Sequence, residues 1–218
     1  MKTNKTKQGF TLVEVLIAVS ILAVTLTAMA TLVIVTMRAN TANMNSLQAY
    51  YLSEQGIEAM RNIRDSNWMQ NYGWNGGDDL WGDSFECDAL NMTRYFTVDE
   101  NETVSASFSR FNLSPVLVLP DYVVAAFPSV PDAPWDLVEI ASVPSDAAKL
   151  YSVVDEGGYT KFTHDTGAGS ETIFSRYIQI SYTDCDQDIA EVSSVVTWNE
   201  RGNEKSLVLS TYLTNWQK

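Results

Sequence analysis

The stretch that decides the fold is residues 9–17, GFTLVEVLI, which open an apolar run that continues to Met37. Glu14 is the only charged residue between Phe10 and Met37. An α-helix needs about 20 apolar residues to cross the hydrocarbon core of a bilayer, so this run is long enough to span a membrane. Three lysines precede the run, and basic residues on that side place the N-terminus in the cytoplasm and the rest of the chain outside.

Two ordinary explanations of this segment meet difficulties. A secretory signal peptide has an apolar core of about 7–15 residues and a small-x-small cleavage site, which Ala28-Met29-Ala30 imitates. The run is longer than that, however, and Glu14 falls where a signal core is uncharged. An uncleaved single-pass anchor fits the length of the run but does not explain a role for Glu14. A carboxylate inside a bilayer costs about 2.5–3.5 kcal/mol on insertion scales, so such a residue is a candidate functional residue.

The same residues closely resemble the type IV prepilin signature: a short basic leader ending in Gly, an aromatic residue, a Glu four positions later and a long apolar helix. The resemblance implies that a prepilin peptidase cuts between Gly9 and Phe10 on the cytoplasmic side. It also implies N-methylation of the new Phe10 amine and pairing of Glu14 with the Phe10 ammonium of a neighbouring subunit. A buried carboxylate beside a buried ammonium offsets part of the desolvation cost of each group. The Glu-Val-Leu form of the motif is more similar to minor pilins and pseudopilins than to principal subunits.

The helical pattern continues beyond the apolar run. Residues 38–66 contain no proline and one glycine, Gly56. Helical spacing predicts one apolar-to-small face made by Tyr50, Ser53, Ile57, Met60 and Ile63. Gly56 lies beside this face and would allow close approach of a sheet. Glu58 with Arg61, and Arg61 with Asp65, have the spacing of ion pairs along a helix.

The remainder of the chain predicts a β-rich body. Phe174–Tyr182, Ala190–Trp198 and Ser206–Thr214 are rich in alternating, β-branched or aromatic residues, with polar turns at Asp184–Asp188 and Asn199–Asn203. They predict a three-stranded antiparallel meander that lays one face on the helix. Thr103–Phe111 and Val116–Phe127 also have strand character, although six prolines from Pro115 to Pro144 break the middle region. The fold class is therefore α+β, and the pilin resemblance implies a lollipop layout.

These patterns divide the chain into four parts: a leader peptide (1–9), a transmembrane or filament-core helix (10–37), an amphipathic continuation of that helix (38–66) and an exported β-rich domain (67–218). The formal net charge is −13, and removal of the leader lysines Lys2, Lys5 and Lys7 would make the chain more acidic still. Such a body repels phosphate backbones, so no direct nucleic-acid partner is expected.

Two further sets of residues are candidate sites. Cys87 and Cys185 allow one pairing, but whether they bond is left open, since the Cα atoms must come within about 7 Å. Asp184, Asp186 and Asp188 alternate as calcium ligands do. The glycine expected at the sixth position of an EF-hand loop is replaced by Ile189, so a solvated hairpin turn is the alternative.

No catalytic constellation is apparent. His164 is the only histidine, and it is expected in a loop spanning Thr163–Ser170 without partners that would make it catalytic. No glycine-rich phosphate loop, HExxH helix or nucleophile elbow is present. The sequence therefore predicts no enzyme and, apart from calcium, no cofactor.

The resemblance implies a structural subunit of a type IV pilus or a type II secretion-like filament. Its expected partners are other pilin or pseudopilin subunits, prepilin peptidase, the inner-membrane assembly machinery and, before assembly, membrane lipid. The chain is expected in the cytoplasmic membrane with its body outside, and then in an extracytoplasmic filament. The alternative is a permanently anchored single-pass protein with an extracytoplasmic β-rich binding domain.

Overall fold

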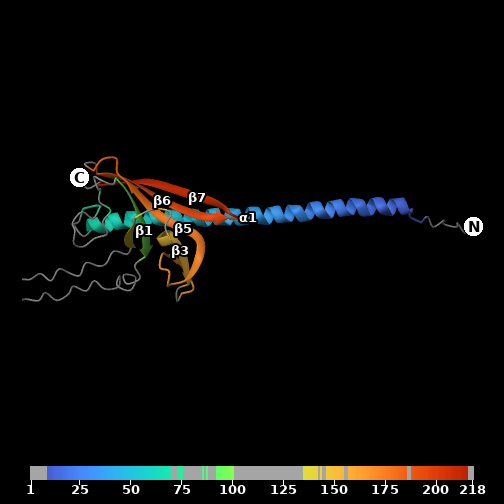
Figure 1. Ribbon diagram of the computed structural model, residues 1–218, viewed down its shortest axis with the longest axis horizontal. Helices are drawn as coiled ribbons and strands as arrows, with labels where there is room; N and C mark the ends of the chain where they lie inside the picture. The colour runs from blue at the N-terminus through green and yellow to red at the C-terminus, as the bar shows by residue number, and fades with distance from the viewer. Residues whose placement is uncertain are drawn as a thin grey trace, which may run out of the picture. The chain divides into compact units, whose positions relative to one another are not determined.

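The computed structural model describes residues 9–69, 73–75, 85, 87, 92–100, 135–141, 143, 146–154, 157–185 and 188–215 (Figure 1). The chain divides into two compact units, Met1–Ser46 and Leu47–Lys218. The second unit holds the C-terminal turns of one long helix packed against an antiparallel sheet, so the α+β fold predicted from the sequence is confirmed. The predicted strands Thr103–Phe111 and Val116–Phe127 lie outside the described residues.

The helix α1 runs from Leu12 to Met69, a length of 58 residues. Hydroxyl groups inside its apolar part donate to the carbonyl four residues earlier, at 2.8–3.1 Å for Ser20, Thr27 and Thr31. These bonds satisfy polar groups that a lipid environment would leave without partners. The helix continues three residues beyond the predicted end at Ser66. Trp68, 8% exposed, joins the hydrophobic core instead of starting a loop.

The predicted packing face of α1 is confirmed at four of its five positions. Ser53, Ile57, Met60 and Ile63 are buried, whereas Tyr50 is 42% exposed and its assignment was wrong. One turn before Ser53, the residue that faces the sheet is the fully buried Ala49, four positions earlier, and not Tyr50, three positions earlier. A small side chain there packs with Leu150, Val196 and Trp198 without separating helix from sheet.

Gly56 marks the closest approach of α1 to the sheet. A Cβ atom at this position would lie 2.5 Å from Oγ of Ser194 and 2.9 Å from Cδ1 of Ile178. The Ser53 hydroxyl donates to the Ser194 carbonyl at 2.8 Å in the same crossing. The close approach predicted for Gly56 is therefore confirmed.

Ion pairing along α1 follows the prediction only in part. Arg61 pairs with Glu58, as expected. Asp65 accepts instead from Nε of Arg64 at 2.9 Å. Arg61 points elsewhere, because its Nη2 donates to Oγ1 of Thr211 on the sheet at 3.4 Å.

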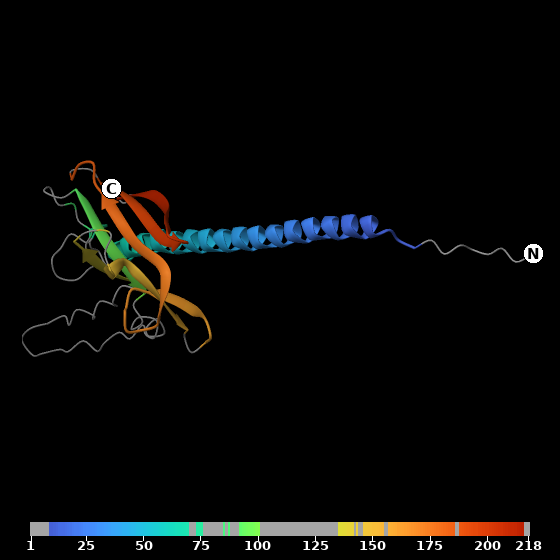
Figure 2. The same ribbon diagram turned by 45° about the vertical axis from the view of Figure 1, so that its right-hand side comes forward.

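The sheet is built on three long antiparallel strands, β5 (Ser170–Ser181), β6 (Ile189–Glu200) and β7 (Asn203–Thr214). They lie side by side over the C-terminal part of α1 in both views (Figures 1 and 2). The predicted meander is confirmed, with strands longer than expected. The last turn is two residues, Arg201 at φ 56° and Gly202 at φ 83°, rather than Asn199–Asn203. Two residues of positive φ match the twist of antiparallel strands.

Four shorter strands and a 3₁₀-helix complete the described sheet region: β1 (Thr93–Glu100), β2 (Trp135–Ile140), η1 (Asp146–Ala148), β3 (Lys149–Val154) and β4 (Thr160–Thr163). β6 pairs along one edge of β5, and β1 and β3 pair with different parts of the other. Two buried clusters lie between α1 and this sheet. The larger is centred on Met60, Phe96 and Ile178, and the smaller on Leu52, Phe174 and Trp198.

Candidate processing and assembly site

Gly9 and Phe10 lie immediately outside α1, on a part of the chain that makes few contacts. Phe10 is 83% exposed, and nothing lies within 4 Å of the position that a Cβ on Gly9 would occupy. The helix begins at Leu12, and the backbone N–H of Glu14 donates to Oγ1 of Thr11 at 3.3 Å. The Gly9–Phe10 peptide bond is thus accessible and not part of the helix.

Glu14 lies in the first turn of α1 and its side chain is exposed. It is followed by a helix whose apolar window has a mean hydropathy of 2.4 and no buried residue. This is the one helix, among the described residues, that is long and apolar enough to cross a membrane. Its large apolar side chains are exposed throughout, including Leu12, Ile17, Leu22, Leu26, Met29, Ile34 and Met37. Water is a poor solvent for such a surface, so the segment needs lipid or other apolar helices around it.

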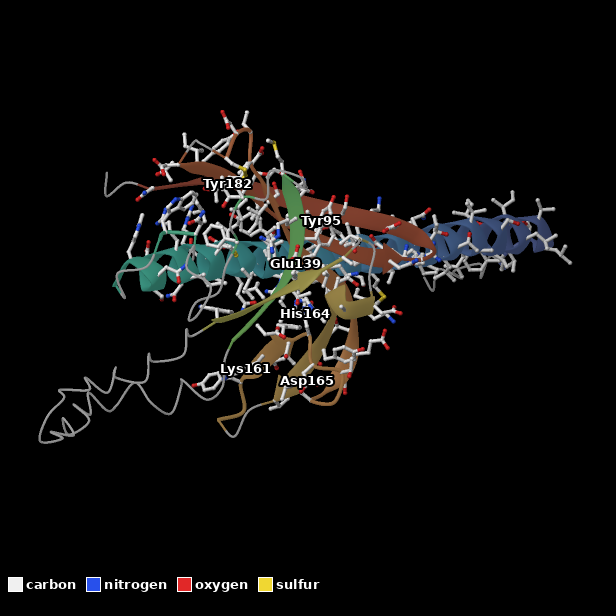
Figure 3. All side chains as sticks on the ribbon, turned by 60° about the vertical axis from the view of Figure 1, so that its left-hand side comes forward. Tyr95, Glu139, Lys161, His164, Asp165 and Tyr182 are labelled. Atoms are coloured by element: carbon white, nitrogen blue, oxygen red, sulfur yellow. A yellow bond between two sulfur atoms is a disulfide. The ribbon has the colours of Figure 1, made fainter. Side chains whose placement is uncertain are left out.

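The two cysteines are joined in the structure. Cys87 and Cys185 form a disulfide in the structure, with Cα atoms 5.4 Å apart, within the distance that the pairing requires. The bond ties the chain that follows α1 to the connection between β5 and β6. The Tyr182 hydroxyl, labelled in Figure 3, donates to the Phe85 carbonyl at 2.7 Å nearby. Trp74 packs edge-on against Phe85, so the segment is held by an aromatic cluster as well.

The acidic triplet is described only in part. Asp184 and Asp188 lie at the β5–β6 connection, and Asp186 lies outside the described residues. The Asp188 carbonyl accepts the backbone N–H of Asn215 at 3.0 Å. No group of three or more His, Cys, Asp or Glu within the described ranges is arranged to hold a metal ion. Calcium binding at these three acids therefore stays a prediction.

A buried arginine was missed by the sequence analysis. Arg176 on β5 is 1% exposed, between the buried Phe174 and Ile178. Its guanidinium donates to the Leu52 carbonyl (3.4 Å), to Oε1 of Gln55 (2.9 Å) and to the Val98 carbonyl (2.6 Å). Burial lowers the pKa of Arg176 to about 10, which leaves it charged at neutral pH. An arginine on the inward face of an alternating strand was the available signal.

His164 lies beside this arginine, in the predicted connection after β4 (Figure 3). Its backbone N–H donates to both carboxylate oxygens of Asp99 at 2.9 Å, and its Nδ1 lies 3.1 Å from the Lys149 carbonyl. Nε2 is shielded from solvent and has no hydrogen-bond partner within the described part of the chain. Burial, followed by the charge of Arg176, lowers the pKa of His164 to about 3. The ring is therefore neutral at physiological pH.

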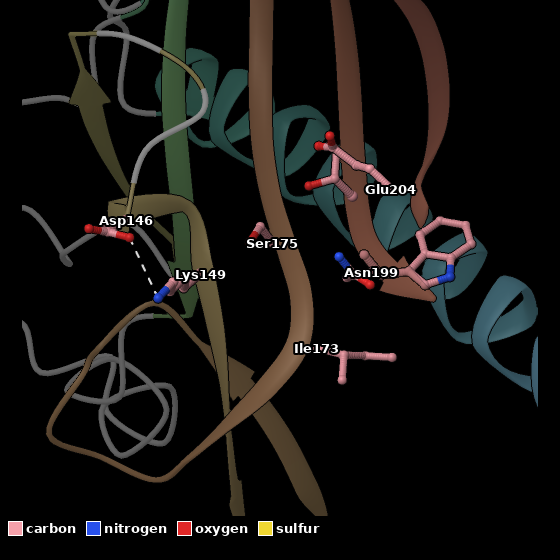
Figure 4. Close-up of a pocket in the computed structure, with 8 residues that line it drawn as sticks. Asp146, Lys149, Ile173, Ser175, Asn199 and Glu204 are labelled. Carbon is pink, nitrogen blue, oxygen red and sulfur yellow. Dashed lines mark ion pairs between the residues drawn. The ribbon is translucent and has the colours of Figure 1, made fainter. Parts of the chain in front are cut away.

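An open hollow of about 450 Å³ lies at one side of the sheet (Figure 4). Lys149 lines it and pairs with Glu171 at 3.2 Å and with Asp146 at 3.5 Å. The hydrogen bond to Glu171, followed by its charge and that of Asp146, raises the pKa of Lys149. A lysine held in its charged form is a poor nucleophile or base, so these residues do not assemble an activated catalytic group.

Comparison with known proteins identifies the N-terminal region. Residues 4–30 match the family model of the prokaryotic N-terminal methylation motif, the type IV pilin and pseudopilin signature. Comparisons with curated proteins and with solved structures gave no match. The N-terminal segment is therefore type IV pilin-like, and the match covers Gly9, Phe10 and Glu14. Proteins with this motif are processed by prepilin peptidase and assemble with other pilins. The motif and the apolar helix together fit a membrane-anchored protein.

Proposed function

We propose that the chain is a minor pilin or pseudopilin, a structural subunit of a type IV pilus or a type II secretion-like filament. The observation that carries this proposal is the methylation motif at residues 4–30 together with an exposed Gly9–Phe10 bond at the start of an apolar helix. Prepilin peptidase cuts between Gly9 and Phe10, and the new Phe10 amine is N-methylated. The subunit then leaves the membrane by packing α1 among the helices of its neighbours.

Glu14 sets the position of each subunit during that transfer. The exposed apolar side chains of α1 can exchange lipid for other helices at little cost, but such packing does not specify an axial position. A carboxylate in this environment requires a positive partner, and the Phe10 ammonium of a neighbouring subunit supplies one. Removing either charge leaves the other buried and unpaired, which is more costly than losing both.

The body is proposed to lie outside the cytoplasm, with a structural and not an enzymatic role. The Cys87–Cys185 disulfide supports this location, because such bonds persist in oxidising compartments. The net charge of −13 supports solubility of the exported part. Its sheet faces other pilins, the cell's surroundings or exported substrates.

The alternative is a permanently anchored protein that presents the same β-rich body as a binding domain. Both functions use α1 as a membrane span, but only the filament subunit has to lose its leader. Processing at Gly9 therefore discriminates between them.

Intact mass and N-terminal sequencing of the protein from its native membrane or filament fraction test the proposal. We expect a chain that begins at Phe10 and carries one methyl group on its amine. Gly9→Leu is the matched control and is expected to keep the leader, because a bulky residue blocks the cleavage position. A wild-type chain that keeps Met1 in cells with active prepilin peptidase would contradict the filament function and favour the permanent anchor. A chain beginning after Ala30 would contradict both and indicate a secreted soluble protein.

A further inference from the structure

Thr11 immediately precedes Leu12, the first residue of α1, and its contacts are those of a helix N-cap. Its hydroxyl oxygen accepts the Glu14 N–H at 3.3 Å, and its carbonyl accepts the N–H groups of Glu14 (3.1 Å) and Val15 (3.3 Å). The first N–H groups of a helix have no acceptor inside the helix, and a capping side chain supplies an acceptor for one of them. Thr11 and Glu14 also have the spacing of a capping box.

We propose that Thr11 is a positioning residue for leader removal: by capping α1 it holds the Gly9–Phe10 peptide bond outside the helix, in a form that the peptidase can bind. This inference rests on the proposed function. Thr11 takes no part in the chemistry of cleavage. It determines which conformation of the chain the peptidase meets.

The position of the helix start matters because a peptide bond inside a helix is a poor substrate. Its N–H and carbonyl groups are already hydrogen-bonded within the helix, whereas proteases cleave segments that are locally unfolded. In the structure the Gly9–Phe10 bond is accessible, because Phe10 is 83% exposed and nothing lies within 4 Å of the position that a Cβ on Gly9 would occupy. Capping two residues downstream of Gly9 preserves this state.

The residues around Thr11 do not by themselves keep the Gly9–Phe10 bond outside the helix. Phe10 is apolar, and the run that begins there favours helix in a membrane environment, where unpaired backbone groups are costly. Glycine at position 9 disfavours helix, but only by about the same amount as one capping bond contributes. Without the Thr11 cap, α1 can therefore extend by one turn toward the N-terminus and include both Phe10 and Gly9.

Cleavage of the full-length protein in membrane vesicles that contain prepilin peptidase tests this inference. We expect Thr11→Val, which keeps the shape but loses the acceptor, and Thr11→Ala to lower kcat/KM about fivefold, the effect of losing a typical N-cap. Thr11→Ser and Thr11→Asn, which provide capping oxygens on different side chains, are expected to stay within about twofold of wild type. The backbone carbon shifts of Phe10 in uncleaved, micelle-bound protein are expected to become helical in Thr11→Val and to remain non-helical in Thr11→Ser.

Three outcomes would overturn the inference. Equal slowing by Ser, Asn and Val would mean that the peptidase reads the threonine side chain itself. Full activity of Thr11→Val would mean that the cap is not needed. Slow cleavage without a change in the Phe10 shifts would separate cleavage from the helix start. Failure of the proposed function looks different, because wild-type protein would then not be cleaved at all.

Discussion

Acidification is expected to destabilise the sheet domain through His164, the only histidine in the chain. The structure places its ring near Arg176 on β5 and beside the carbonyl of Lys149 on β3, while its backbone N–H donates to Asp99 on β1. The carbonyl accepts from Nδ1, so the neutral ring carries its proton there and leaves Nε2 as a shielded acceptor. Protonation would add a second buried positive charge near Arg176.

The magnitude follows from the two pKa values. Burial, and then the charge of Arg176, lowers the pKa of His164 from 6.5 to about 3 on folding. Above the unfolded value the ring is neutral in both states and contributes no pH dependence. Between the two values the unfolded chain takes up a proton that the folded chain does not. The free energy of unfolding then falls by about 1.4 kcal/mol per pH unit, which is about 2 kcal/mol on reaching pH 5.

Two measurements on a fragment spanning 38–218 check this expectation. The imidazole proton signal of the single histidine can be followed by NMR from about pH 8 to pH 4, and no titration is expected in that range. Urea unfolding followed by tryptophan fluorescence gives the free energy of unfolding at about pH 7.5 and pH 5. His164→Asn is the matched control, because its amide keeps a donor near the Nδ1 position but does not titrate. We expect wild type to lose about 2 kcal/mol more than this variant.

The control is necessary because carboxylates in the chain also titrate near pH 5 and affect both proteins equally. A histidine signal that titrates near pH 6.5 would refute the argument directly. Equal losses of stability in wild type and His164→Asn would refute it as well. Either result would mean that the ring is solvated in the folded state.

Two other substitutions test the packing and the assembly. Gly56→Ala is expected to reduce the free energy of unfolding by about 1–2 kcal/mol in urea titrations despite its better helix propensity, because its Cβ meets Oγ of Ser194. In a Ser194→Ala background, Gly56→Ala should reduce the free energy of unfolding by much less than it does in wild type. An equal reduction in both backgrounds would show that the contact with Oγ of Ser194 is not the cause. Glu14→Gln, which removes only the charge, is expected to be cleaved and methylated normally but to fall at least about tenfold in the sheared filament fraction measured by immunoblot. Glu54→Gln, an exposed acid on the same helix, is the control, and equal recovery of both variants would contradict pairing with the Phe10 amine.

The parts of the fold that the sequence predicted are those that depend on local patterns. A helix period along α1 and alternation in β5, β6 and β7 are properties of neighbouring residues, and both were confirmed. The short strands were harder, because they form by pairing with distant partners. β1 pairs with the C-terminal part of β5, where Phe96 lies opposite Ile178, and no local signal in Thr93–Glu100 specifies that partner.

The candidate site shows the same division. Gly9, Phe10 and Glu14 form one short motif, and its resemblance to the prepilin signature implies processing and assembly roles. Cys87 and Cys185 are 98 residues apart, and the fold must bring them together before pairing can be judged. Arg176 was overlooked because an inward-facing charge contradicts the alternating pattern that identified its own strand.

The placement of Arg176 has a physical explanation in the layering of the helix–sheet contact. Ala49 and Leu52 belong to the smaller apolar cluster, and Ile57 and the residues after it belong to the larger one. Between them, one turn of α1 meets the sheet through polar contacts: Gln55 and the Leu52 carbonyl accept from Arg176, and Ser53 donates to β6. Apolar surfaces tolerate sliding by a turn, but sliding here would leave a buried guanidinium without acceptors, at a cost of several kcal/mol. The polar turn therefore fixes which residues of α1 the sheet contacts, a specification that the apolar clusters cannot provide.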